Sequence, residues 1–134
     1  MEELKLEATK ANLDKVLSFI DGHLENNACS MKSQMQIDLA AEEIFVNIAQ
    51  YSYAPGTGSA TIRLSVADGS AEITFIDSGI PYDPLAKEDP DITLSSEERQ
   101  IGGLGIFLIK QYMDDVRYEY SDGQNKLTIV KKLS

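Results

Sequence analysis

Apolar and polar positions alternate along this chain with two different periods, which divide it into strands and helices. Leu4, Leu6 and Ala8 alternate with polar residues, as on a strand with one buried face. In residues 11–27 the apolar residues recur every three or four positions and mark one helical face: Leu13, Val16, Leu17, Ile20 and Leu24. A second helix is predicted from about Ser30 to Tyr53, because a serine at the capping position precedes further apolar residues at helical spacing.

The two-residue period returns after the segment "APGTGS", which ends the second helix. Residues 60–66 and 71–75 alternate on either side of "ADGS", and this predicts a hairpin. A polar stretch from Leu85 to Gln100 is typical of a loop, and an apolar helix follows to about Met113. A last hairpin is predicted from "VRYEYS" and "KLTIVKKL" across "DGQN". The expected order is β-α-α-β-β-loop-α-β-β.

This order of elements predicts the fold class. Adjacent hairpins favour an antiparallel or mixed sheet, and helices with one apolar face each can cover one side of it. We therefore expect a single α+β domain over residues 1–134, a two-layer α/β sandwich with a mixed, mostly antiparallel sheet and helices on one face. A doubly wound parallel sheet is disfavoured because strands and helices do not alternate one for one.

Composition excludes several classes of function. A formal net charge of -10, from 12 basic and 22 acidic residues, argues against nucleic acid, since phosphate binding depends on lysine and arginine. No apolar run approaches the roughly 20 residues of a membrane helix, and we expect no membrane partner. The single cysteine, Cys29, excludes an internal disulfide framework, and with no signal-like start we expect a cytoplasmic protein. A bound anion must be held locally, by backbone N–H groups or by a shared metal ion.

Three glycines, Gly102, Gly103 and Gly105, stand directly before the apolar third helix. Their spacing differs from the dinucleotide-binding G-x-G-x-x-G, and the lysine and hydroxyl of a Walker loop are missing. A plain tight turn would explain the glycines alone. The alternative is a phosphate site, because glycine N–H groups and the positive end of the helix would face the same place.

Two further segments place polar residues among apolar ones. Glu43 and Asn47 are four residues apart and share one helical face. The amide oxygen of Asn47 could ligate a hard metal ion, while the carboxylate of Glu43 orients or deprotonates water or a hydroxyl group. The simpler alternative is that both residues lie on the solvated flank of an amphipathic helix. Asp77 ends an apolar strand and is followed by Gly79. A carboxylate there needs hydrogen bonds, which an exocyclic amine could supply, although a strand-capping Asx-turn is also common.

Together these segments resemble the N box and the two glycine boxes of the GHKL (Bergerat-fold) ATPases: Glu43-x-x-x-Asn47, Asp77-x-Gly79-x-Pro81 and Gly103-x-Gly105. The compact length, "PYDP" and "GGLGIFLIK" are most similar to the anti-sigma-factor serine kinases of bacterial partner-switching systems. The resemblance covers most of the chain. It implies one histidine-kinase-like ATPase domain that binds ATP and Mg²⁺.

The resemblance also implies a role for each matched residue of the first two boxes. Asp77 would accept the adenine amine, Gly79 would make room for the ring, and Pro81 would complete that nucleotide-binding box. Asn47 would ligate Mg²⁺, and Glu43 would act as the catalytic general base toward the attacking hydroxyl.

The rest of the implied site belongs to the segment around the second glycine box. Gly103 and Gly105 would cradle the phosphates with their N–H groups. The nucleotide-binding residues of this segment would be Gly102, Gly103, Leu104 and Gly105. Residues 85–102 would form a lid over the nucleotide. Arg99 is the expected catalytic contact to the γ-phosphate, with a surface pair to Glu97 or Glu98 as the alternative.

Two functions remain open at this point. One is a protein serine/threonine kinase that transfers the ATP γ-phosphoryl group to a serine of an anti-sigma-factor antagonist protein of the STAS type. The other is a non-catalytic, nucleotide-dependent module that sequesters a sigma factor or another regulator. The helical hairpin of sensor histidine kinases and a transducer domain are both missing, so we expect the domain to act on, or hold, another protein. A homodimer is left open.

Overall fold

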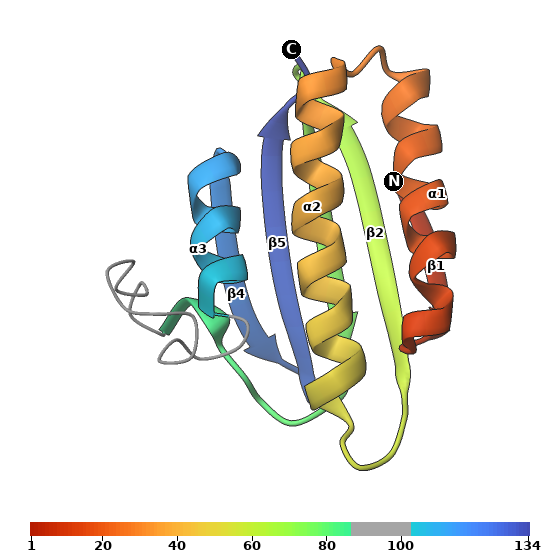
Figure 1. Ribbon diagram of the computed structural model, residues 1–134, viewed down its shortest axis with the longest axis vertical. Coiled ribbons are helices and arrows are strands. Elements are labelled where there is room, and N and C mark those ends of the chain that lie inside the picture. Colours follow the sequence, from red (N-terminus) through yellow and green to blue (C-terminus); the bar gives the residue numbers. More distant parts are fainter. Residues whose placement is uncertain (87–102) are drawn as a thin grey trace.

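The computed structural model describes residues 1–86 and 103–134 (Figure 1). The predicted order of elements is confirmed: β1 Glu2–Glu7, α1 Leu13–Asn26, α2 Met31–Asn47, β2 Ser59–Ala67, β3 Ser70–Asp77, α3 Gly103–Tyr112, β4 Asp115–Ser121 and β5 Gln124–Lys132. Short helical turns precede α1 and follow α2 and β3. No helix among these residues is both long and apolar enough to cross a membrane.

The strands form one sheet in the order β1-β2-β3-β5-β4, and the three α-helices lie on one face of it (Figure 1). All four pairings are antiparallel, so the predicted two-layer α+β class is confirmed and the described sheet contains no parallel pair. The register places Ala60, Asp77 and Asn125 opposite one another on β2, β3 and β5. Asp77 and Asn125 are therefore cross-strand neighbours at one end of the sheet.

The core lies between the sheet and the helices. Its largest fully buried side chains come from both layers, as the alternation and the helical spacing predict: Val16, Ile20, Leu24, Ile37, Phe45, Ile62, Ile73, Phe75 and Ile129. Only three polar side chains of the described residues are buried, namely Ser33, Asp77 and Asn125. Two of these three are the cross-strand neighbours, so the core becomes polar at one end of the sheet.

The second helix changes geometry where it reaches that end. Ser30 caps α2 as predicted, because its Oγ accepts from the N–H of Ser33 at 3.1 Å. After Asn47 the helix continues as one wider π-helical turn, Ile48–Ser52. The Ile80 N–H donates to the Ser52 carbonyl at 3.0 Å, which joins the end of this turn to the loop after β3. The predicted helix to Tyr53 is thus correct to within one residue, with an altered last turn.

Candidate functional site

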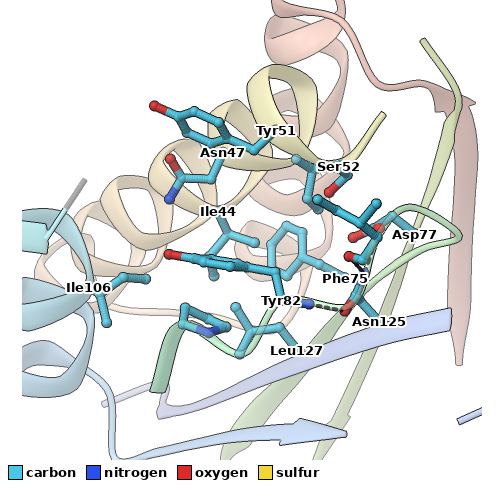
Figure 2. Close-up of a pocket in the computed structure, with 13 residues that line it drawn as sticks. Ile44, Asn47, Tyr51, Ser52, Phe75, Asp77, Tyr82, Ile106, Asn125 and Leu127 are labelled. Carbon is cyan, nitrogen blue, oxygen red and sulfur yellow. Dashed lines mark hydrogen bonds between the residues drawn. The ribbon is translucent and has the colours of Figure 1, made fainter. Parts of the chain in front are cut away.

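A pocket opens where α2, the loop after β3, α3 and β5 meet (Figure 2). It encloses about 590 Å³ of space, part of it open to solvent. Most of its lining is apolar, with a few polar groups, as in sites for small molecules and cofactors: Ile44, Asn47, Ile48, Tyr51, Ser52, Phe75, Asp77, Ile80, Tyr82, Pro84, Ile106, Asn125 and Leu127. Two residues predicted from the sequence, Asn47 and Asp77, are in this wall.

Asp77 is 5% exposed and is held by hydrogen bonds to only one of its two oxygens. Oδ1 accepts from the Gly79 N–H at 2.9 Å and from the Asn125 amide at 3.0 Å. The first of these bonds is the Asx-turn considered from the sequence. No hydrogen bond reaches Oδ2 from residues 1–86 or 103–134. A buried carboxylate in the pocket wall thus keeps one acceptor atom for a donor on a ligand.

Asn125 fixes this arrangement by using its whole amide group. Its Nδ2 donates to Asp77 and to the Ile80 carbonyl, the latter at 2.8 Å, while its Oδ1 accepts from the Tyr82 N–H at 3.0 Å and from the Tyr118 hydroxyl. Burial, assisted by nearby carboxylates, raises the pKa of the Tyr118 hydroxyl, so it remains a donor at neutral pH. Because both N–H bonds of the Asn125 amide donate and its oxygen accepts two hydrogen bonds, the amide group can adopt only one orientation. These bonds connect β5 to the loop after β3.

Sequence reasoning did not find Asn125. It is 6% exposed and stands in line with Leu127 and Ile129, at inward positions of β5. A polar residue at an inward position of an otherwise apolar alternation is the signal that could have identified it. Tyr82, which reaches across the pocket in Figure 2, gave no comparable signal.

Gly79 lies against the backbone of Ser52. A Cβ atom added at residue 79 would be 2.1 Å from the Ser52 carbonyl oxygen, closer than any real contact. The sequence assigned Gly79 to making room for a ligand ring, and that remains a prediction. The structure adds a second reason for glycine, which is the close approach of two loops that form one side of the pocket.

Gly79→Ala is expected to lower the free energy of unfolding by about 1–3 kcal/mol, because the new methyl group must push the Ser52 backbone away. Urea unfolding followed by circular dichroism measures the change. Gly22→Ala is the matched control, since a Cβ there meets nothing within 4 Å and should add about 0.5–1 kcal/mol of helix stability. Equal stability of the two variants would contradict the close contact.

Glu43 and Asn47 lie together, as their spacing predicts. The Asn47 Nδ2 donates to Glu43 Oε1 at 3.3 Å, which leaves the Asn47 oxygen available to a cation. Glu43 itself borders a neighbouring hollow between α2 and α3. In Figure 2, Asn47 lies across the pocket from Asp77 and Asn125. The pocket therefore has an acceptor at one end and an amide at the other, and Glu43 contacts that amide from the neighbouring hollow.

The second glycine box begins α3. The helix starts at Gly103, so Gly103, Leu104 and Gly105 form its first turn, and the next residue, Ile106, is in the pocket wall. A helix leaves the N–H groups of its first turn without intrahelical partners, and this turn of α3 comes directly before Ile106 of the pocket wall. Gly102, Arg99 and the predicted lid from residue 87 onward lie outside the described residues. Pro81 is exposed in the loop after β3 and is not part of the pocket lining.

The chemistry of the pocket fits a nucleotide with a divalent cation. The free Asp77 oxygen suits an exocyclic amine, the apolar walls suit a base, and the Asn47 oxygen suits a hard metal ion. Within the described ranges no group of three or more histidine, cysteine or carboxylate side chains could hold a metal ion alone. A cation here would need further oxygen ligands from the bound molecule.

Comparison with known proteins identifies the class. Residues 6–131 match the histidine kinase-like ATPase domain, and the chain belongs to this family. The serine/threonine-protein kinase BtrW of Bordetella bronchiseptica is 27% identical over 130 residues, which cover 96% of this chain and 91% of that protein. The serine-protein kinase RsbW of Bacillus cereus is 31% identical over 93 residues, covering 66% of this chain and 58% of that protein. The resemblance inferred from the three boxes is confirmed.

Solved structures show the same fold. The RsbU and RsbW domains of Rv1364c from Mycobacterium tuberculosis match with a TM-score of 0.68 and 16% identity, over 99% of this chain and 33% of that one. A blue-light activated histidine kinase of Erythrobacter litoralis matches with a TM-score of 0.59 and 21% identity, over 92% of this chain and 41% of that one. This chain therefore shares its two-layer architecture with both of these structures.

Proposed function

We propose that this protein is an ATP- and Mg²⁺-dependent protein serine/threonine kinase that transfers the γ-phosphoryl group to a serine of an antagonist protein. One observation carries the proposal. One pocket has a free oxygen of buried Asp77 at one end and the Asn47 amide at the other, and that amide is hydrogen-bonded to Glu43 of the neighbouring hollow. The names of the relatives BtrW and RsbW, both serine kinases, support the same activity.

The orientation of the nucleotide follows from these groups. Asp77 Oδ2 accepts the exocyclic amine of adenine, and the apolar walls from Ile44, Phe75 and Leu127 cover the base. The Asn47 oxygen would hold Mg²⁺, and the N–H groups that open α3 would receive the phosphate charge. Mg²⁺ supplies neutralisation of the phosphate charge as the γ-phosphoryl group leaves.

Glu43 acts on the incoming serine. Its carboxylate takes the proton of the serine hydroxyl while the serine oxygen bonds to the γ-phosphorus and the bond to the β-phosphate oxygen breaks. The products are phosphoserine and ADP. The hydrogen bond from Asn47 holds the carboxylate in position for this transfer. Catalysis thus comes mainly from positioning and charge neutralisation, with Glu43 directing the hydroxyl.

The alternative is a non-catalytic module that sequesters a sigma factor or another regulator in a nucleotide-dependent way. Such a module would bind nucleotide in the same pocket, but Glu43 would not act as a general base. Both functions require ATP and Mg²⁺, so nucleotide binding tests their common basis, and the rate of phosphoryl transfer separates them.

We expect MgATP at 100 times its dissociation constant to add roughly 2.7 kcal/mol to the free energy of unfolding. Thermal denaturation with MgATP, with ATP plus EDTA, and with MgGTP measures this. The stabilisation should be largest for MgATP, because the Asn47 oxygen contributes only when the cation is present and guanine has a carbonyl oxygen where adenine has the amine that Asp77 Oδ2 would accept. If no adenine nucleotide stabilises the protein in a Mg²⁺-dependent way, the proposed function is wrong.

A further inference from the structure

The outer face of α2 carries an unusual apolar stripe. Met31, Met35 and Leu39 are 90%, 60% and 51% exposed and stand four residues apart, so they follow one line along the helix. With Leu17 of α1 and Cys29 of the connection between the helices, they line a groove between α1 and α2. An exposed run of large apolar side chains within a groove is typical of a surface that contacts another molecule.

The polar lining of this groove is acidic. Besides Gln34 it comprises the carboxylates of Glu25, Asp38 and Glu42, and no lysine or arginine lines it in the part of the chain that the structure describes. The Gln34 amide donates to Glu25 across the groove at 3.2 Å. Glu25, Asp38 and Glu42 lie beside the apolar stripe, so an occupant meets both apolar surface and negative charge.

Among the described residues, two carboxylate oxygens on the helices that form the groove are buried with no donor other than the carboxyl group of the facing aspartate. They are Oδ1 of Asp38, on α2, and Oδ1 of Asp21, on α1. Buried acceptors are normally satisfied, and these two can share a hydrogen bond only while one of the two carboxyl groups is protonated. A donor that enters the groove from outside would satisfy Asp38, because that side chain is part of the groove lining.

We propose that the α1–α2 groove docks an amphipathic helix of a partner protein, with apolar side chains on the methionine–leucine stripe and lysine or arginine side chains on Glu25, Asp38 and Glu42. The stripe extends over nine residues, a rise of about 12 Å or two helical turns, which matches anchors at four-residue spacing on a second helix. Methionine side chains adapt to different partners. The proposal does not rest on the nucleotide pocket.

Charge selects this occupant over others. A second copy of the chain would bring its own net charge of -10, and nucleic acid would bring phosphates, so both oppose the acidic groove. A basic helix complements it. Because Leu39 and Glu42 also border the hollow that contains Glu43, a helix in the groove would lie next to the proposed general base.

Docking should be coupled to proton release from Asp38. Burial, then a hydrogen bond and charge from Asp21, and finally the charge of Glu25 raise the pKa of Asp38 to about 8. The groups that face it are Asp21 and Glu25 of α1, Cys29 of the connection, and the groove lining of α2. A cation against Asp38 favours the carboxylate and lowers this pKa. Affinity is therefore expected to rise as the pH rises from about 6 toward 8, and Asp38→Asn should remove that rise.

Methyl NMR of the methionines in the full chain tests the proposal without nucleotide. The probe is a synthetic helical peptide of alanine, leucine and lysine, with leucines at four-residue intervals; the matched control replaces lysine by glutamate. The lysine peptide should shift the methyl signals of Met31 and Met35 and leave that of core residue Met113 unchanged, and the glutamate peptide should shift none.

A pair of variants separates the groove from general charge. Met35→Lys should weaken binding of the lysine peptide by at least about 10-fold, because it removes an apolar contact and adds a like charge. Ser65→Lys, with the same charge change on the sheet face away from the helices, should change the affinity by less than about twofold.

Three results would overturn the proposal. They are equal binding of the glutamate peptide, equal weakening by Met35→Lys and Ser65→Lys, and shifts of the Met31 and Met35 signals with protein concentration alone. The third would identify a second copy as the occupant. None of them affects the kinase proposal, since nucleotide is absent from the experiment.

Discussion

Glu43→Gln is expected to lower the rate of phosphoryl transfer to the antagonist serine by about 10²- to 10⁴-fold, the usual effect of losing a general base. Glutamine keeps the size of the side chain and an oxygen that can accept from Asn47, as Glu43 does at 3.3 Å. It cannot take a proton from serine. The affinity for MgATP should therefore remain nearly unchanged while transfer slows. Incorporation of labelled phosphate into a co-purified antagonist protein measures the rate.

The control for this variant is Glu119→Gln, which removes a carboxylate from the exposed face of β4 and should leave the rate unchanged. Asn47→Ala should differ from both, because it removes the metal ligand and weakens nucleotide binding itself. If Glu43→Gln transfers phosphate as fast as the wild type, Glu43 is not the base. If the wild type phosphorylates no partner yet binds one when ATP is present, the binding module is the correct function.

Asp77→Asn should weaken ATP binding by about 1.5–3 kcal/mol, or roughly 10- to 150-fold, and reduce discrimination against GTP. The carbonyl oxygen of the new amide can keep the hydrogen bonds from Gly79 and Asn125. Its NH₂ group then takes the place of Oδ2 and presents donors to the adenine amine. The substitution thus replaces a hydrogen-bond acceptor by a donor at the position that faces the base. The bonds to the loop after β3 remain, so the fold should survive. Titration calorimetry with MgATP and MgGTP measures both changes.

Asp68→Asn is the matched control, because Asp68 has φ 54° in the β2–β3 turn at the opposite end of the sheet, where asparagine is equally suited. It should leave ATP binding unchanged. Unfolding of Asp77→Asn would show that Asp77 serves only the Asx-turn and the contact with Asn125. An unchanged preference for ATP over GTP would exclude Asp77 as the acceptor of the base.

Features that depend on neighbours in the sequence could be predicted. The two Asp-Gly turns have positive φ at both residues, 54° and 77° at Asp68 and Gly69 and 54° and 74° at Asp122 and Gly123, as tight hairpin turns require. Glu43 and Asn47 meet because a helix brings residues four apart together. The strand-ending position of Asp77 and its bond to Gly79 are equally local.

Features that depend on distant pairing could not be predicted. Asn125 contacts Asp77 only because β5 pairs with β3, and neither hydrophobic period nor turn sequence specifies which strands become neighbours. The contact of Gly79 with Ser52 likewise needs the π-helical end of α2 to reach the loop after β3. The α1–α2 groove depends on how two helices pack, and the period of each helix predicts only its buried face.

The position of β5 determines when the pocket can exist during protein synthesis. β5 is the last of the described strands to leave the ribosome, yet it lies between β3 and β4, and in the part of the chain that the structure describes β4 pairs with no other strand. Asn125, which ties Asp77 to the Ile80 loop, is on this strand. A nascent chain translated only through β4 lacks Asn125 and Leu127, two residues of the pocket wall, and the strand that joins β3 to β4. We therefore expect the pocket to form only after β5 has been synthesised.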